Sequence, residues 1–150
     1  LIGGPGTGKT HVATALGIQA IEHHRRKVRF FSTIELVNAL EQEKAKGKAG
    51  QIAESLTRLD LVILDELGYL PFEANAAHLF FQLVSSRYER ASLIVTSNKP
   101  FGRWGEIFYD DVIAAAMIDR LVHHAEVLVL SGESYRTRAR RELLTKDRNN

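Results

Sequence analysis

The sequence predicts an α/β fold in which helices flank a parallel sheet on both faces. Short apolar segments alternate with longer helical segments along the whole chain of 150 residues, and this alternation is typical of parallel sheets. Several of the apolar segments are continuous runs, as expected of strands that are covered on both faces. Since no internal repeat is visible, we expect a single domain over residues 1–150.

The first predicted helix follows a glycine-rich loop. Residues 1 and 2 fit the end of a first strand, residues 10–24 fit the helix, and residues 28–31 fit a second strand. Small and apolar side chains recur along the helix at the spacing of one face, which we expect to be buried: Ala13, Leu16, Gly17, Ala20 and Ile21.

A second helix is predicted directly after residues 28–31. Ser32 or Thr33 fits its N-cap position, because a hydroxyl there can accept a hydrogen bond from a free backbone N–H group of the first turn. One face of this helix carries Leu36, Val37 and Leu40. The polar, lysine-rich segment 41–50 predicts a break, and residues 51–59 fit a further helix.

The remaining chain repeats the alternation of strands and helices. Strands are predicted over residues 61–64, 93–96 and 127–130. The helix over residues 74–88 has the apolar stripe Leu79, Phe80, Leu83 and Val84. The helix over residues 110–123 carries Val112, Ala115, Ala116 and Leu121. An arginine-rich helix or tail follows.

Composition excludes several classes of protein. The chain contains no cysteine, so disulfides and thiolate metal sites are excluded. No apolar run has the length of a membrane span, and we expect a cytoplasmic protein without a membrane partner. The formal net charge is only +2. Basic residues nevertheless cluster at 25–27, 44–48 and 136–141, where they fit either a nucleic-acid partner or an ordinary solvated surface.

The glycine-rich loop matches the complete phosphate-binding pattern G-x-x-x-x-G-K-[ST] from Gly3 to Thr10. Glycines let the backbone turn so that its N–H groups point at phosphate oxygens, and the start of the following helix favours anions. In such a loop Lys9 reaches the β- and γ-phosphates of the nucleotide, and the hydroxyl of Thr10 ligates Mg²⁺.

Two acids follow the apolar run 61–64. A carboxylate at the end of that strand faces the metal held by Thr10, so Asp65 is predicted as the second Mg²⁺ ligand. Glu66 is placed to polarise a water molecule for attack on the γ-phosphate. A pair of acids alone is weak support for this chemistry, and the complete phosphate-binding loop upstream is what strengthens it.

Two further residues are candidates for the same site. Asn98 follows the strand 93–96, and its amide could hold the attacking water; alternatively it forms a turn before Lys99 and Pro100. Arg120 lies near the end of a helix. It could reach the nucleotide of a neighbouring subunit and neutralise charge there, or it could form an ordinary salt bridge at a helix end.

Paired histidines occur at two predicted helix ends, His23-His24 and His123-His124. Adjacent residues on a helix point in different directions, so each pair is expected to make a poor metal clamp. Favourable interaction of a positive side chain with the helix C-terminus is the better interpretation.

The order of these motifs resembles the AAA+ ATPases of the DnaC-like branch, and more closely the IstB-like transposition helpers of insertion sequences. The resemblance covers essentially the whole chain. The glycine-rich loop and the acid pair are generic to NTPases. Trp104-Gly105 and Asp119-Arg120-Leu121 with His123-His124 also resemble the family, and the much more specific stretches are Glu66 to Pro71 and Gly132 to Arg136.

The resemblance implies an AAA+ core with a five-stranded parallel sheet of order 5-1-4-3-2 and no full lid domain. Asp65-Glu66 would be the Walker B motif, Asn98 the sensor 1 residue and Arg120 the arginine finger. Arg136 is a candidate for a sensor 2-like role. The predicted nucleotide-binding residues are Gly3, Gly4, Pro5, Gly6, Thr7, Gly8, Lys9, Thr10, His11 and Arg136.

The resemblance also implies an activity and partners. The protein would be a Mg²⁺-dependent ATPase that forms a homo-oligomer with ATP at subunit interfaces. It would bind double-stranded DNA and assist a partner transposase in selecting target sites. The helical region 33–59 lies where initiator-type members carry an extra helix facing DNA, and Lys44, Lys46 and Lys48 fit phosphate contacts there.

Three alternatives remain at this point. A helicase loader of the DnaC type would share every catalytic residue. A nucleotide-gated DNA-binding module would share the site but show little turnover. A small-molecule kinase would share the phosphate-binding loop, but Asp65-Glu66 and Asn98 suit activation of water better than that of an acceptor hydroxyl. Because the chain begins with Leu1 and not with Met, we also expect it to be part of a longer protein.

Overall fold

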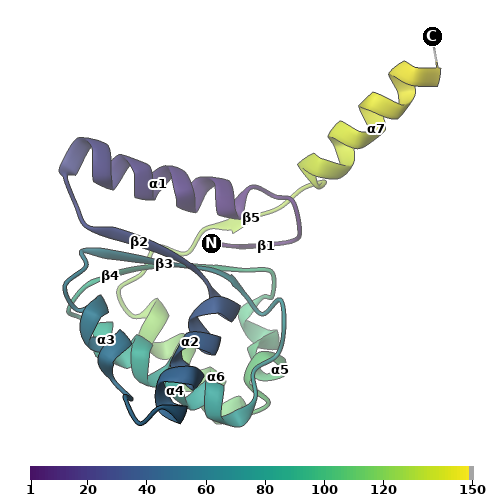
Figure 1. Cartoon of the computed structure of the whole chain (residues 1–150). Helices are drawn as coiled ribbons and strands as arrows, with labels where there is room; N and C mark the ends of the chain where they lie inside the picture. Colours follow the sequence, from purple (N-terminus) through teal and green to yellow (C-terminus); the bar gives the residue numbers. More distant parts are fainter. Residues whose placement is uncertain (149–150) are drawn as a thin grey trace.

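The computed structural model describes the backbone of residues 1–148, with side chains through residue 145 (Figure 1). Its strands are β1 (Ile2–Gly3), β2 (Val28–Ser32), β3 (Leu61–Leu67), β4 (Ser92–Ser97) and β5 (Val129–Leu130). Its helices are α1 (Lys9–His24), α2 (Thr33–Ala45), α3 (Gln51–Leu56), α4 (Ala74–Arg87), the 3₁₀ turn η1 (Phe101–Arg103), α5 (Trp104–Phe108), α6 (Asp111–Val122) and α7 (Tyr135–Arg148).

The five strands form one parallel sheet in the order β2-β3-β4-β1-β5. Read from the other edge this is 5-1-4-3-2, so the predicted strand order is confirmed. Ile2 pairs with Ser97 of β4 on one side and with Val129 of β5 on the other. The start of the phosphate-binding loop therefore leaves the sheet between β4 and β5.

The two faces of the sheet are covered unequally (Figure 1). Among residues 1–148, α1 is the only helix that lies on one face, while α2, α3, α4, α5 and α6 pack below the other. The main hydrophobic core lies on the second face, where Phe72, Phe80 and Phe108 meet edge-to-face and stacked. The uneven cover explains why α1 differs from its predicted pattern.

Of the five residues expected to form the buried face of α1, only Ala13 and Gly17 are buried. Leu16 and Ile21 are each about half exposed, at 47% and 49%. A Cβ on Gly17 would lie 2.8 Å from the Cδ1 of Ile63 in β3, so the helix rests directly on the sheet at this point. Because no neighbouring helix within residues 1–148 packs against α1 on this face, the side chains of Leu16 and Ile21 remain half exposed.

Two other helices differ from the expected boundaries or phase. Helix α2 continues to Ala45 through the expected break, because Glu43 is buried and its carboxylate accepts a hydrogen bond of 3.0 Å from the N–H of Ile52 in α3. Helix α6 buries Ala114 and Met117, whereas Val112 is 78% exposed. The helix packs against both α5 and α4, and these contacts lie on the face that carries Ala114 and Met117.

The other predicted elements are present, although β3 extends to Leu67, α3 ends at Leu56, and η1 and α5 were not predicted. Helix α4 buries Phe80, Leu83 and Val84 as expected. Ser32 is the N-cap of α2 and accepts a hydrogen bond from the N–H of Glu35 at 3.2 Å. Strand β5 is shorter than predicted, at two residues. None of the helices formed by residues 1–148 combines the length and the apolarity needed to cross a lipid bilayer.

Candidate nucleotide site

The loop between β1 and α1 is shaped by its glycines. Gly6 and Gly8 have φ angles of +70° and +94°, in the left-handed region that side chains disfavour. Gly3 has a different reason to lack a side chain: a Cβ there would lie 2.2 Å from the carbonyl oxygen of Leu130. The helix begins at once after the loop, with a hydrogen bond of 2.9 Å from Val12 N–H to the carbonyl of Gly8.

Lys9 lies over this loop. Its Nζ donates a hydrogen bond of 2.7 Å to the carbonyl of Gly4. Burial lowers the pKa of Lys9, the carboxylates of Asp65 and Glu66 act in the opposite direction, and the cation of Arg136 lowers it further. The ammonium group therefore stands among charged groups from β3 and α7, at the position where a phosphate chain would need it.

Asp65 is the centre of the acidic side of the site. It is buried, and it lies within β3 instead of after it, as the sequence had suggested. The hydroxyl of Thr10 lies 2.9 Å and 3.0 Å from its two carboxylate oxygens. Hydroxyl and carboxylate oxygens are ligands that Mg²⁺ prefers, so these two residues fit the metal expected here.

A residue that the sequence interpretation did not single out holds the two acids together. The hydroxyl of Thr96, at the end of β4, donates to Asp65 at 2.5 Å and accepts a hydrogen bond of 2.9 Å from the backbone N–H of Glu66. Thr33 adds a further contact, donating to the backbone carbonyl of Asp65 at 2.7 Å. The only sequence signal for Thr96 was a hydroxyl at the end of an apolar run.

Glu66 has an unusual backbone conformation. Its φ angle is +63°, although it is not a glycine, and its side chain is exposed. The pairing of β3 with β4 shifts register between Leu64 and Leu67, so Glu66 lies in a bulge. Bulges re-aim side chains at functional sites, and a left-handed non-glycine residue is a strained one. The strand is thus deformed where the predicted water-activating carboxylate stands.

Asn98 follows β4 at the same edge of the sheet. Its side-chain oxygen lies beside Gly68, 3.2 Å from the position that a Cβ on Gly68 would take. Both residues line a hollow of about 310 Å³ together with Tyr69, Lys99 and Glu106. The structure thus places Asn98 next to the loop that follows Glu66, and its contact with a water molecule stays a prediction.

The segment after β5 packs against the phosphate-binding loop. The N–H of Tyr135 donates a hydrogen bond of 2.9 Å to the carbonyl of Gly6. A Cβ on Gly6 would collide with the hydroxyl of Ser134 at 2.1 Å. Arg136, one residue further on, lies near enough to Lys9 to lower its pKa. The structure therefore brings Arg136 to the loop. His11, another predicted nucleotide-binding residue, is exposed in the first turn of α1.

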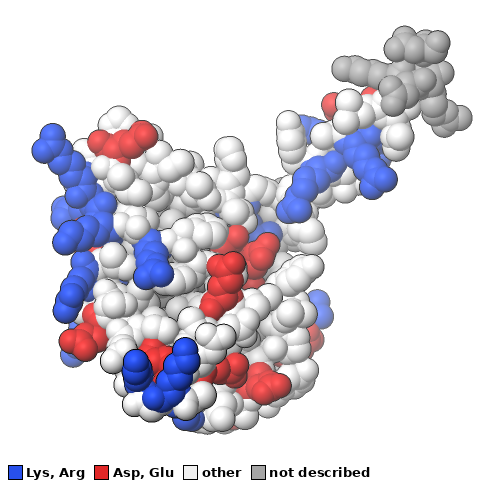
Figure 2. Space-filling model, in the orientation of Figure 1, with Lys and Arg blue, Asp and Glu red and all other residues white. Residues whose placement is uncertain are grey.

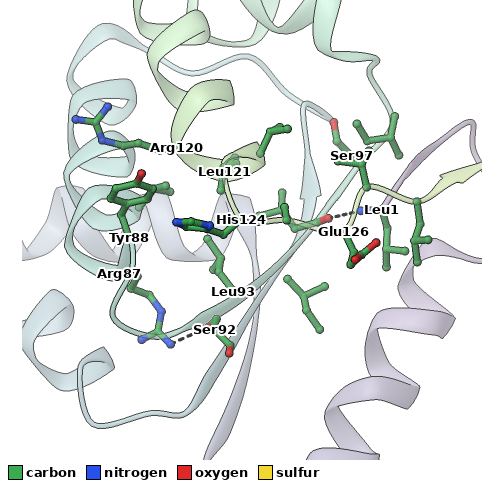
Figure 3. A pocket seen from close by; sticks show the side chains of 18 of the residues that line it. Leu1, Arg87, Tyr88, Ser92, Leu93, Ser97, Arg120, Leu121, His124 and Glu126 are labelled. Carbon is green, nitrogen blue, oxygen red and sulfur yellow. Dashed lines mark hydrogen bonds between the residues drawn. The ribbon is translucent and has the colours of Figure 1, made fainter.

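Arg120 stands apart from these residues. Its guanidinium group lies 4.7 Å from the centre of the Phe81 ring in α4. In Figure 3, Arg120 and Leu1 lie on opposite sides of a pocket of about 620 Å³ that both residues line. Within one chain, Arg120 is therefore packed on α4 and is not gathered with the loop.

The chain is similar to proteins of insertion sequences. A protein of insertion sequence IS21 from Pseudomonas aeruginosa, named for ATP binding, is 45% identical over 149 residues, which are 98% of this chain and 56% of that protein. A similarly named protein of IS5376 from Geobacillus stearothermophilus is 45% identical over 140 residues, 93% of this chain and 55% of its own length. The chain thus spans about half the length of these relatives.

Solved structures share the fold at low sequence identity. The DnaC helicase loader matches with a TM-score of 0.70 and 21% identity, over 87% of this chain and 76% of the loader. The replication initiator DnaA, solved with AMPPCP and single-stranded DNA, matches with a TM-score of 0.71 and 20% identity, over 97% of this chain and 44% of the initiator.

The sequence model of the IstB-like ATP binding proteins matches residues 1–143, which include the glycine-rich loop, both acids, Asn98, Arg120 and Arg136. The similarity therefore extends from the loop into α7, and the chain belongs to the IstB-like ATP binding protein family.

Proposed function

We propose that this protein is a Mg²⁺-dependent ATPase of an insertion sequence, which binds double-stranded DNA and assists a partner transposase in selecting target sites. The observation that carries the ATPase assignment is the cluster formed by Lys9, Thr10, Asp65 and Glu66. Residues from the loop and from β3 meet there, and the Thr96 hydroxyl joins the two acids.

Each residue of this cluster has a distinct task in the proposal. The backbone of the loop and the Lys9 ammonium bind and orient the phosphates. Thr10 and Asp65 would hold Mg²⁺, which neutralises phosphate charge when bound. Glu66 accepts a proton from the attacking water, and its bulged backbone directs the carboxylate out of the strand. Asn98 orients that water, and Arg136 adds positive charge beside Lys9.

Arg120 acts in the neighbouring subunit. A transition-state arginine must reach the transferred phosphoryl group, and Arg120 is packed on Phe81 away from the loop of its own chain. This arrangement favours a homo-oligomer in which ATP lies at subunit interfaces. Binding of ATP would then hold subunits together, and hydrolysis would weaken the assembly on DNA.

The basic surface supports a nucleic-acid partner. Figure 2 shows Lys and Arg side chains on α7, which projects away from the domain, and at the end of α1 that leads into β2. Arg136, Arg138, Arg140 and Arg141 in α7 are exposed, and so are Lys44, Lys46 and Lys48 near the end of α2. Such residues neutralise DNA phosphates without reading sequence.

The transposition role is favoured over a helicase loader by similarity. The relatives from insertion sequences are 45% identical to the chain, whereas the DnaC helicase loader is 21% identical and supports the fold alone. Asp65, Glu66 and the loop would be shared by both kinds of protein, so the catalytic residues do not discriminate between them.

The test is steady-state phosphate release with ATP and Mg²⁺, measured alone, with double-stranded DNA, and with DNA plus a partner protein, which is either a candidate transposase or a replicative helicase. We expect DNA to stimulate release and the transposase to change it further. If no phosphate is released under any of the three conditions although ATP and DNA still bind, the protein is a nucleotide-gated DNA-binding module. Stimulation by a replicative helicase but not by the transposase would identify a loader.

A further inference from the structure

Helix α6 ends in two adjacent histidines whose rings lie against each other. The helix stops at Val122, and His123 is its C-cap residue. The chain then turns, with a hydrogen bond of 3.2 Å from Ala125 N–H to the carbonyl of Val122. The ring centres of His123 and His124 are 4.2 Å apart and nearly parallel, at 24°. The helical spacing that would separate adjacent side chains therefore does not hold here.

A carboxylate from another element completes the cluster. Glu89 lies in the loop between α4 and β4, and its Oε1 is 2.9 Å from the Nε2 of His124. One ligand atom from each of Glu89, His123 and His124 lies within 4.8 Å of the other two. The hydroxyl of Tyr88 is hydrogen-bonded to the Nδ1 of His123. Glu89, His123 and His124 are all exposed, so their side chains can rotate toward a common centre.

A hydrogen bond joins the two ends of the loop that carries Glu89. The guanidinium group of Arg87, the last residue of α4, is buried and donates to the carbonyl of Ser92, the first residue of β4, at 2.9 Å (Figure 3), and also to the carbonyls of Leu56 at 2.6 Å and Leu59 at 3.3 Å. Glu89 itself has a φ angle of +58°, a conformation uncommon for a non-glycine residue. A strained residue on an anchored loop is a common feature of ligand sites.

We propose that Glu89, His123 and His124 bind a divalent transition-metal ion such as Zn²⁺. Two imidazoles and one carboxylate form a ligand set used for Zn²⁺ and related ions, which leaves a coordination position for water. The Tyr88 hydroxyl is the outer partner that orients the ring of His123. Mg²⁺ prefers oxygen ligands, so this site is chemically distinct from Thr10 and Asp65.

The ion would join the loop between α4 and β4 to the end of α6. Glu89 belongs to the α4–β4 loop, and the histidines end α6, which carries Arg120 one turn earlier. Figure 3 shows Tyr88, His124 and Arg120 on the same side of the pocket. A metal cross-link there would fix the end of α6, and with it the helix that presents Arg120.

The test is titration of the untagged protein with ZnCl₂ by calorimetry, and with Co²⁺ by visible absorption, in the absence of nucleotide. We expect a single Zn²⁺ ion per chain and a Co²⁺ spectrum typical of nitrogen and oxygen ligands. Tyr88→Phe removes an outer partner and should weaken Zn²⁺ binding by roughly 10- to 100-fold. Glu89→Gln and His124→Gln each remove a ligand and should weaken Zn²⁺ binding by more than that.

The chain offers a matched control in His23 and His24, an adjacent exposed pair at the end of α1. The double variant His23→Gln/His24→Gln should bind Zn²⁺ like the wild type, and so should Asp65→Asn. Absence of Zn²⁺ binding by the wild type, binding unchanged in Glu89→Gln and His124→Gln, or loss of binding in either control would each overturn the proposal. Nucleotide binding by every variant except Asp65→Asn checks that the fold is intact.

Discussion

The hydroxyl of Thr10 lies within hydrogen-bond distance of both carboxylate oxygens of Asp65, at 3.0 Å and 2.9 Å, across 55 residues of sequence. The contact joins the first turn of α1 to β3. A hydroxyl and a carboxylate at this separation can both contact one metal ion.

Replacing Lys9 with alanine should abolish ATP binding, because the ammonium group that would meet the phosphates is removed. Binding is measured by fluorescence with a labelled ATP analogue. Lys48→Ala removes an exposed lysine away from the loop and should bind nucleotide normally. Tight binding of ATP by Lys9→Ala would contradict the placement of the phosphates over this loop.

Replacing Glu66 with glutamine should leave ATP binding intact and slow hydrolysis by about 10²- to 10⁴-fold, the usual contribution of a general base. Phosphate release and ATP binding are measured on the same preparation. The variant should also remain assembled on DNA in the presence of ATP. Glu54→Gln, which changes an exposed acid in α3, is the matched control. Normal turnover by Glu66→Gln would remove Glu66 as the base.

Replacing Thr96 with valine should affect both stability and catalysis. The change removes a hydroxyl that donates to Asp65 and accepts from the N–H of Glu66, so that this N–H loses its partner and the Asp65 carboxylate keeps only the Thr10 hydroxyl. We expect a loss of about 1–3 kcal/mol in the free energy of unfolding, measured with denaturant. Hydrolysis should fall by about 100-fold, since the two acids would no longer be held in register.

Thr96→Ser keeps the hydroxyl and should retain most of the activity. Equal losses in the serine and valine variants would show that the methyl group and not the hydroxyl matters at this position.

Replacing Arg120 with alanine should lower hydrolysis by about 10³-fold if it acts as an arginine finger. Mixing Arg120→Ala subunits with Glu66→Gln subunits should restore activity at interfaces where an intact Arg120 meets an intact Glu66. Phe81→Leu removes the ring on which the guanidinium rests but keeps the charge, so it separates packing from catalysis. Mixed oligomers that stay inactive would argue that Arg120 does not act across subunits.

Replacing Gly3 with alanine should destabilise the fold by about 1–3 kcal/mol, because the new methyl group would overlap the Leu130 carbonyl oxygen and the backbone must shift. Gly4→Ala is an internal control, since a Cβ there meets no atom within 4 Å. Denaturant unfolding of the two variants compares them directly. Equal free energies of unfolding for the two variants would show that β5 can shift to accommodate the methyl group without loss of stability.

The sequence predicted the elements whose signals are local. The apolar runs 61–64 and 93–96, the loop from Gly3 to Thr10 and the N-cap at Ser32 all have patterns that depend on neighbouring residues only. Asp65 and Glu66 were assigned to the correct edge of the sheet, but the bulge that turns Glu66 outward depends on the pairing of β3 with β4, which no local pattern encodes.

Tertiary contacts account for what the sequence did not reveal. Arg87 is buried although arginine is usually exposed, because carbonyls from two other segments surround it. Thr96 looks like any β-branched strand residue until Asp65 is placed beside it. The rings of His123 and His124 come together only because the helix ends and the chain turns at that point.

The hydrogen bond between Tyr135 and Gly6 makes α7 a lever arm with its pivot at the phosphate-binding loop. The helix runs from Tyr135 to Arg148 and projects away from the domain, as Figure 1 shows. At 1.5 Å per residue its far end lies about 20 Å from the pivot, so a rotation of about 10° at the loop displaces that end by about 3–4 Å. A small adjustment of the loop around a phosphate would therefore become a large displacement of arginine side chains.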